Sequence, residues 1–354
     1  MRFVRIGELH TGMVIAKAIY GLRGVLILRE GRALGARHIE ALTELGYPGI
    51  YIHDLISDGI ELEEIVDEQT RHNAISMVKN LYKAGELTTT RTQIMHREME
   101  DLINEIVSSI FESDAAVVNV PLLKSYDEYT YRHSVDVGVL SVALGKSMGF
   151  TREKLLDLGK AAFFHDMGKM FIPQTILNKA DKLTEDEFVI MKKHSQMGHD
   201  FVEKVLLQKS SIMRGVLHHH ERFDGSGYPH GLKGVMIPQF ARIIAAADVF
   251  DAISSTRPYK VAQLATEGYE YILGNSGSHF DPEIVDIFYK TIAPFPVGMT
   301  VKLSNGLNGV VVKNNANFMS RPLVRAFEPE NPSVFEMIDL SKGAAALDIT
   351  IVGN

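Results

Sequence analysis

Short apolar runs separated by glycines mark the first 62 residues of the chain. Runs such as Gly12–Ala16, Val25–Leu28 and Gly49–Ile52 have the length of single strands, and only residues 36–45 show the apolar spacing of a helix. We therefore predict a small mixed α/β domain over residues 1–62.

The middle of the chain has the pattern of helices. Residues 63–114 are rich in charge, follow a helical period and contain no proline, which predicts two amphipathic connecting helices. Apolar residues recur at three-to-four spacing over 124–148 and over 152–167. A capping box predicts a further helix over 184–205, and the pair Asp281-Pro282 marks the start of the last one.

Strand-like runs and Asn-Gly turns return after Pro294-Phe295-Pro296. Residues 294–354 are therefore expected to form a small C-terminal β unit. The chain as a whole is expected to be mainly α, with an all-helical catalytic domain over residues 115–293 and a helical connector over 63–114.

Composition narrows the possible functions. The 354 residues include 37 Lys and Arg against 44 Asp and Glu, a net charge of −7, so no overall basic field exists for DNA or RNA. The chain has no cysteine, so a metal site must use His, Asp and Glu. The first residues lack the apolar core of a signal peptide, and no window approaches a membrane span. We expect a cytoplasmic protein without a membrane partner.

The histidines gather in one part of the chain. Half of the 14 histidines lie within residues 133–220. The pair His165-Asp166 stands at the polar end of an apolar helix, where a buried charge needs a partner such as a metal ion. Three successive histidines, 218–220, close another apolar stretch, and at least two of them are expected to be ligands. His194 is a further candidate ligand.

Two acidic residues lie on the helix expected after Pro238. Asp248 follows three alanines on an apolar face, so its carboxylate requires a cation or a strong hydrogen-bond donor. Asp251 is three residues further on, and it could cap the helix or pair with Arg257.

Cationic and aromatic residues near these positions could bind a phosphorylated substrate. Lys169 lies one helical turn after the His-Asp pair and could reach a ligand at the metal, although an ordinary lysine at a helix end would look the same. The loop Asp224–Pro229 contains two glycines that could bring Tyr228 up to a ligand. Arg257 and Lys260 add two cations that suit phosphate groups.

Taken in order, these residues resemble the HD-GYP family, a branch of the HD superfamily of metal-dependent phosphohydrolases. The resemblance runs from about residue 124 to 291 and rests on His133, His165-Asp166-x-x-Lys169, His194, His219-His220-Glu221, Asp224-Gly225-x-Gly227-Tyr228-Pro229, Ala241-Arg242-Ile243, Asp248 and Arg257-Pro258-Tyr259. It implies an HD-type helical bundle and hydrolysis of the bacterial second messenger cyclic di-GMP to pGpG and GMP.

The resemblance also implies a dinuclear centre. One metal would be bound by His133, His165, Asp166 and Asp248, and the other by His194, His219 and His220, with Asp166 bridging both. A hydroxide between the two ions would attack the phosphorus, with Asp166 and Lys169 as catalytic residues. Imidazole and carboxylate ligands favour iron or manganese. Lys169, Tyr228, Arg257 and Lys260 would contact the substrate, and His218 would be structural.

Two positions depart from the family pattern. Relatives with a third metal have Glu four residues before the first histidine ligand, where this chain has Tyr129, so two metals are predicted. Asp136 stands where many relatives have Asn, and the sequence suggests no functional reason.

Three other functions remain open at this stage. The chain could be a catalytically silent receptor for cyclic di-GMP, although a receptor has no need of two metals. It could hydrolyse another cyclic dinucleotide such as 3′,3′-cyclic GMP-AMP, because base choice depends on pocket shape. Oxygen activation at an iron centre ranks last.

The N-terminal domain or the connector helices could form a homodimer.

Overall fold

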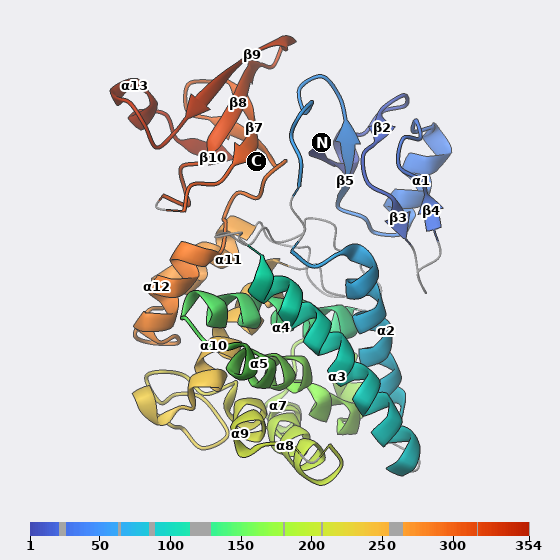
Figure 1. The fold of residues 1–354 in the computed structure, drawn as a ribbon, viewed down its shortest axis with the longest axis vertical. Coiled ribbons are helices and arrows are strands. Elements are labelled where there is room, and N and C mark those ends of the chain that lie inside the picture. The colour runs from blue at the N-terminus through green and yellow to red at the C-terminus, as the bar shows by residue number, and fades with distance from the viewer. Residues whose placement is uncertain are drawn as a thin grey trace. The chain divides into compact units, whose positions relative to one another are not determined.

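The structure is a computed structural model that describes residues 1–20, 26–62, 65–84, 89–113, 129–179, 181–206, 208–254, 265–316 and 318–353. Its contacts separate two compact units (Figure 1). One unit is built from the described residues within 1–64 and 289–354, and the other from those within 65–115 and 128–288.

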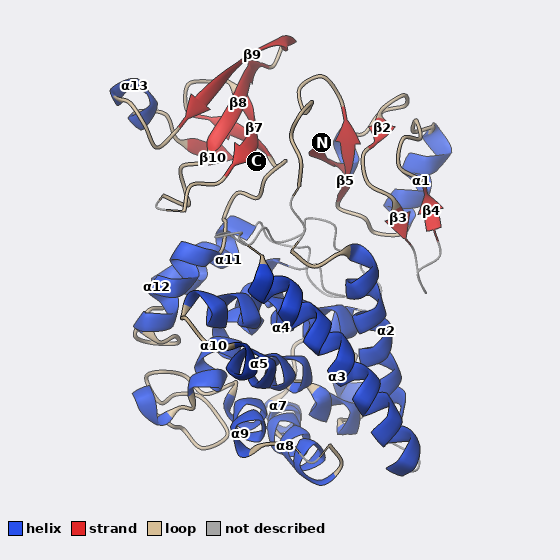
Figure 2. Ribbon diagram, in the orientation of Figure 1, coloured by secondary structure: helices blue, strands red, loops and turns tan. Residues whose placement is uncertain are grey.

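The second unit is helical (Figure 2). Its helices are α2 (Glu68–Ala84), α3 (Thr89–Glu112), α4 (Tyr129–Ser147), α5 (Arg152–Phe164), η3 (Met167–Phe171), α6 (Gln174–Leu177), α7 (Glu185–Lys192), α8 (His194–Lys204), α9 (Ser210–His218), η4 (Gly234–Met236), α10 (Gln239–Ser254), α11 (Ala265–Gly274) and α12 (Pro282–Thr291), which ends in the other unit. The predicted fold class, mainly α with an HD-type helical bundle, is confirmed. Among the described residues, no helix is both long and apolar enough to cross a membrane.

Helices α4, α5, α9 and α10 pack together at the centre of the helical unit. Close approach of α4 and α5 depends on Gly138, where a Cβ would lie 2.3 Å from the ring of Phe163. Phe163 and Phe164 are fully buried, and the three alanines 245–247 of α10 are at most 5% exposed. Burying each such aromatic ring contributes about 1.5–3 kcal/mol, so the apolar faces read from the sequence are the faces that build this core.

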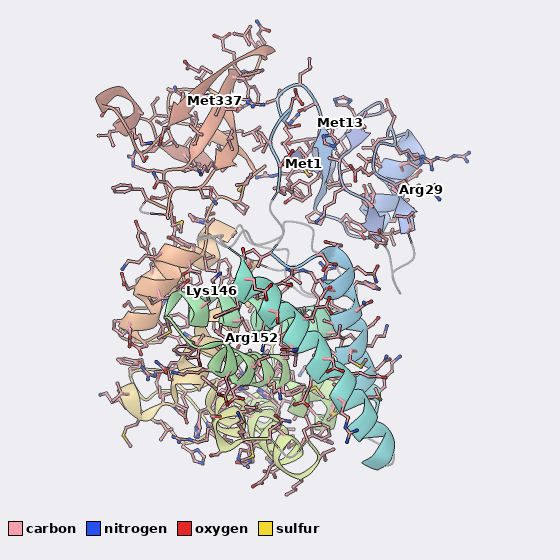
Figure 3. The ribbon with its side chains drawn as sticks, viewed as in Figure 1. Met1, Met13, Arg29, Lys146, Arg152 and Met337 are labelled. Carbon is pink, nitrogen blue, oxygen red and sulfur yellow. The ribbon has the colours of Figure 1, made fainter. Side chains whose placement is uncertain are left out.

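Helices α2 and α3 pack on the same bundle. Lys146 donates to the backbone carbonyl of Ile110 (2.7 Å), and Arg152 donates to Asn104 (2.7 Å) and Ser108 (2.8 Å) on α3. Figure 3 labels the two cationic side chains. Residues 65–113 thus contribute two helices to the helical unit.

The expected helix over 184–205 is two helices. The helix is interrupted at Lys193, between α7 and α8, and His194 begins the second helix. The backbones of η3 and α8 approach each other closely here. A Cβ on Gly168 of η3 would lie 1.9 Å from the carbonyl oxygen of His194. The helix expected over 152–167 likewise ends early, at Phe164, and η3 follows.

The first unit contains the β structure. Its elements are β1 (Arg2–Arg5), η1 (Ile6–Glu8), β2 (Val14–Ile15), β3 (Ile19–Tyr20), β4 (Leu26–Leu28), α1 (Ala36–Glu44), β5 (Gly49–His53), β6 (Thr300–Leu303), β7 (Asn308–Lys313), β8 (Leu323–Glu328), β9 (Asn331–Asp339), α13 (Ala344–Leu347) and β10 (Ile351–Gly353). Antiparallel pairing gives the orders β1-β5-β2, β3-β4 and β10-β6-β7-β8-β9.

The N-terminal and C-terminal β parts meet within this unit. An apolar cluster joins them, formed by Ile56, Ile60, Val297, Val310 and Phe327. The amide of Phe3 donates to the carbonyl of Gly298 (2.8 Å). Arg325 donates to the carbonyls of Ile56 and Asp58, both at 2.7 Å. Segments that lie far apart in the sequence therefore share one core.

Candidate metal centre

Seven side chains from five helical elements converge in the helical unit. His133 comes from α4, His165 and Asp166 follow α5, His194 begins α8, His219 and His220 follow α9, and Asp248 comes from α10. His220 is half-buried and the other six are buried. The structure brings together all seven residues that the sequence analysis named as ligands.

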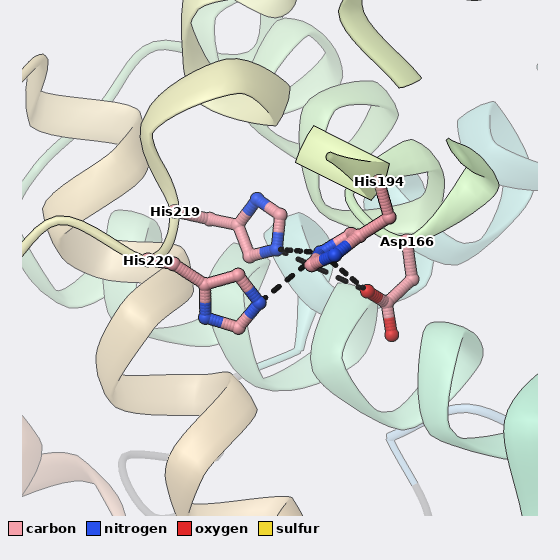
Figure 4. Close-up of side chains that lie close together, drawn as sticks. All are labelled: Asp166, His194, His219 and His220. Atoms are coloured by element: carbon pink, nitrogen blue, oxygen red, sulfur yellow. Dashed lines mark hydrogen bonds and ion pairs between the residues drawn. The ribbon is translucent and has the colours of Figure 1, made fainter. Parts of the chain in front are cut away.

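Asp166 divides the imidazoles into two groups. Its Oδ2 lies 3.4 Å from Nε2 of His165 and 3.7 Å from Nε2 of His133. Its Oδ1 lies 3.4 Å from Nε2 of His194 and 3.9 Å from Nε2 of His219. Figure 4 shows the second group around the carboxylate. One carboxylate therefore offers an oxygen to each of two ligand groups.

The remaining distances complete both groups. Nε2 of His194 lies 3.3 Å from Nε2 of His219 and 3.2 Å from Nε2 of His220. Oδ1 of Asp248 lies 3.1 Å from Nε2 of His133. Donor atoms around one ion, with bonds of about 2.0–2.2 Å, lie roughly 3–3.6 Å apart. The other distances lie in this range, whereas His133 and His219 lie somewhat farther from the Asp166 oxygens, at 3.7 and 3.9 Å.

Hydrogen bonds on the far side of four of the five rings aim Nε2 at the centre. Three rings donate from Nδ1 to the carbonyl three residues earlier: His165 to Ala162 (2.6 Å), His194 to Met191 (2.7 Å) and His219 to Val216 (2.6 Å). His133 donates from Nδ1 to Asp251 (2.8 Å). A carbonyl or carboxylate can only accept, so each of these four Nδ1 atoms carries a proton and the Nε2 atom faces inward.

Two buried polar atoms in the centre have no hydrogen-bond partner in the described part of the chain. They are Nε2 of His165 and Oδ1 of Asp166. An unsatisfied buried polar group costs about 1–3 kcal/mol, and more when it is charged. A divalent cation would satisfy both atoms, so the residues fit a divalent metal site.

Burial and neighbouring charges shift the pKa values of the groups in the centre in different directions. Burial lowers the pKa of His220 to about 3 and places the pKa of His219 well below its usual value, so both rings are neutral, as ligands must be. Burial opposes ionisation of Asp166, but the nearby Lys169 ammonium holds its carboxyl pKa well below the usual range. Burial also opposes protonation of His133, yet hydrogen bonds to Asp248 and Asp251 raise its pKa to about 9.

The predicted substrate-contact residues have mixed outcomes. Lys169 forms an ion pair with Oδ2 of Asp166, so its ammonium lies at the centre. Tyr228 stacks on His220, with ring centroids 4.8 Å apart and planes at 29°. Arg257 and Lys260 lie outside the described residues, so the proposed phosphate clamp has no structural description.

Sequence reasoning missed two contacts that hold the centre. The carboxylate of Asp251 accepts a hydrogen bond from His133, a partner that the sequence analysis did not name, whereas its suggested partner Arg257 lies outside the described residues. Tyr82 of α2 donates to the backbone carbonyl of Asp166 (2.8 Å). The spacing of Asp248 and Asp251 on one apolar helix was the available signal for the first contact. No local pattern could indicate the second.

The Asp136 position also has a structural partner. Its carboxylate, 6% exposed, forms an ion pair with Arg71 of α2. This pairing accounts for a charged residue at a buried position of α4, one that the sequence alone left without a reason.

Comparison with known proteins places this centre in a family. A model of the HD domain matches residues 117–284. Cyclic di-GMP phosphodiesterase PA4108 of Pseudomonas aeruginosa is 35% identical over 296 residues, which is 81% of this chain and 70% of that protein. Cyclic di-GMP phosphodiesterase of Thermotoga maritima is 35% identical over 67% of this chain and 64% of its own length. The 3′3′-cGAMP-specific phosphodiesterase 1 of Vibrio cholerae is 38% identical over 44% of this chain and 35% of its own length. The family expectation is confirmed, and the chain belongs to the HD-GYP family of HD-domain proteins.

Proposed function

We propose that the chain is a metal-dependent phosphodiesterase that hydrolyses cyclic di-GMP to pGpG or GMP. The observation that carries this proposal is the Asp166 carboxylate, which offers one oxygen to each of two histidine groups. The relatives from P. aeruginosa and T. maritima are named cyclic di-GMP phosphodiesterases, which supports cyclic di-GMP as the substrate.

Two divalent ions would occupy the centre. One ion would be held by His133, His165 and Asp248, and the other by His194, His219 and His220. Asp166 would bind both ions. When bound, such a pair lowers the pKa of water and neutralises charge on the phosphoryl group. The donor set contains only imidazole and carboxylate groups, which supports iron or manganese.

The chain's own residues would orient the substrate. The Lys169 ammonium lies beside Asp166 and is placed to bind a phosphate oxygen. Burial raises the pKa of Tyr228, so its hydroxyl stays protonated and would donate to the substrate. Phe188, 46% exposed, lies edge-on to Tyr228 with ring centroids 6.3 Å apart. Together the two rings offer a purine base an aromatic surface.

A second candidate substrate is 3′,3′-cyclic GMP-AMP. The V. cholerae relative that is 38% identical over 44% of this chain is named for that activity. The same metal-ligating residues of this chain would serve for either substrate, because both dinucleotides present the same phosphodiester to the metal centre.

Metal removal and restoration test the proposal. The protein is stripped with a chelator and reloaded anaerobically with ferrous iron or manganese. Each cyclic dinucleotide is then supplied at equal concentration. We expect two ions per chain and turnover that depends on them, with cyclic di-GMP cleaved faster. Three iron or manganese ions per chain would contradict the dinuclear count if His230→Ala, a change outside the seven ligands, left that number unchanged. Bound but uncleaved cyclic di-GMP would favour a receptor.

A further inference from the structure

A second cluster of metal-ligating side chains lies at the end of α9, apart from the seven ligands above. We call His218, Glu221 and His230 the loop cluster. Each residue offers one ligand atom, and the three atoms all lie within 4.8 Å of one another. His218 is the last residue of α9, and the other two lie in the loop that carries Tyr228.

The buried member of the loop cluster lacks a hydrogen bond. His218 is 8% exposed, and its Nδ1 has no hydrogen-bond partner among the described residues. That nitrogen lies 3.5 Å from Oε1 of Glu221, which is long for an N–H···O hydrogen bond. Two donor atoms on one tetrahedral ion, with bonds of about 2.0–2.1 Å, lie roughly 3.3–3.4 Å apart. The observed spacing suits two ligands of one ion.

The other two members are already positioned. Glu221 accepts hydrogen bonds from the amides of His230 (2.8 Å) and Leu232 (3.0 Å), so its carboxylate is fixed in direction. The rings of His218 and His230 have centroids 5.2 Å apart. Oriented carboxylates and imidazoles bind metal more tightly, because little order is lost on binding.

A different surface group shows what the loop cluster adds. His199, Asp200 and Glu203 also offer three ligand atoms within reach of one another. Nδ1 of His199, however, already bonds the carboxylate of Asp200 at 3.2 Å. The loop cluster differs because its buried imidazole nitrogen is unsatisfied.

We propose that His218, Glu221 and His230 bind a zinc ion at a site separate from the dinuclear centre, with water completing the coordination. Two histidines and one carboxylate are a donor set that zinc accepts. The ion would tie the end of α9 to the loop that holds Tyr228 against His220.

Zinc binding to the chelator-stripped full chain tests the site directly. At the same free zinc concentration, His230→Ala should bind one ion fewer per chain than the wild type, whereas His199→Ala should match the wild type. His230 is exposed, so its replacement should leave the fold intact, which circular dichroism checks. Equal zinc counts in the wild type and His230→Ala would overturn the proposal.

A gain of signal provides a second test. The chain has no cysteine, so His230→Cys introduces the only thiol. With added cobalt, a thiolate ligand at this position should produce near-ultraviolet charge-transfer absorption. The double variant His218→Ala, His230→Cys should lose this absorption. His10→Cys, at another exposed histidine, is the matched control. No band in His230→Cys, or an equal band in His10→Cys, would overturn the site. Neither readout depends on turnover, so the test stands whether or not the phosphodiesterase proposal holds.

Discussion

Replacing Asp251 by asparagine should weaken metal binding without removing a ligand. Asp251 is fully buried, and its Oδ2 accepts from Nδ1 of His133 at 2.8 Å. The carboxylate fixes the ring and increases the basicity of Nε2, which faces Asp248. An asparagine amide is neutral and can offer only a weaker acceptor.

The expected magnitude follows from two independent estimates. Loss of a hydrogen-bonded partner behind a metal ligand typically costs about 10- to 100-fold in metal affinity. That loss corresponds to about 1.4–2.7 kcal/mol. Replacing a hydrogen bond to a charged group by a neutral one forfeits about 1 kcal/mol or somewhat more. The two estimates overlap near a tenfold loss.

The assay is a calorimetric manganese titration of chelator-stripped protein at two pH values. Asp251 helps to raise the pKa of His133 to about 9. Protons therefore compete with metal below that pH in the wild type, and the variant suffers less from this competition. The loss of affinity should accordingly be larger at the higher pH.

A matched control separates metal affinity from stability. Asp281, 6% exposed, pairs with Arg242 and accepts from the amide of Glu283 at the start of α12 (2.9 Å). Asp281→Asn should lower the melting temperature and leave metal affinity unchanged. If Asp251→Asn binds manganese as tightly as the wild type at both pH values, the reasoning about His133 is refuted.

Three further substitutions probe the supports of the centre. Gly168→Ala puts a Cβ 1.9 Å from the carbonyl oxygen of His194, so denaturant unfolding should show a loss of about 1–3 kcal/mol or more, together with weaker metal binding. Tyr82→Phe removes the hydrogen bond to the Asp166 carbonyl and should cost about 0.5–1.5 kcal/mol in the same assay. Lys169→Met should lower kcat/KM by roughly 10- to 100-fold while elemental analysis finds the metal count unchanged. Wild-type stability in the first two variants, or metal loss in the third, would contradict these assignments.

Local pattern was enough to locate most helices and several of the candidate ligands, whereas His133 was added by the family resemblance. The apolar spacing over 152–167 reports the face that packs in the core, and the capping box at Thr184 does open α7. His165-Asp166 and the histidines 218–220 could be singled out because burying such groups on apolar helices is costly without a partner.

The rest depends on contacts between residues far apart in the sequence. The division of the Asp166 oxygens between two histidine groups requires three-dimensional placement. Asp251 meets His133 from 118 positions away. The break at Lys193 coincides with the close approach of Gly168 to His194, a contact that no local propensity encodes. The sequence pattern did not indicate His230, because it meets His218 and Glu221 only when the loop folds.

The most direct test of the central claim is cleavage of cyclic di-GMP by the metal-loaded chain. Protein reconstituted anaerobically with ferrous iron or manganese is mixed with cyclic di-GMP, and the products are separated by chromatography. A variant with His165→Ala and Asp166→Ala, which removes the bridging carboxylate, is treated identically. The account predicts pGpG or GMP from the wild type and neither from the variant. Intact cyclic di-GMP after incubation with fully metal-loaded wild type, or equal cleavage by the folded variant, would contradict it.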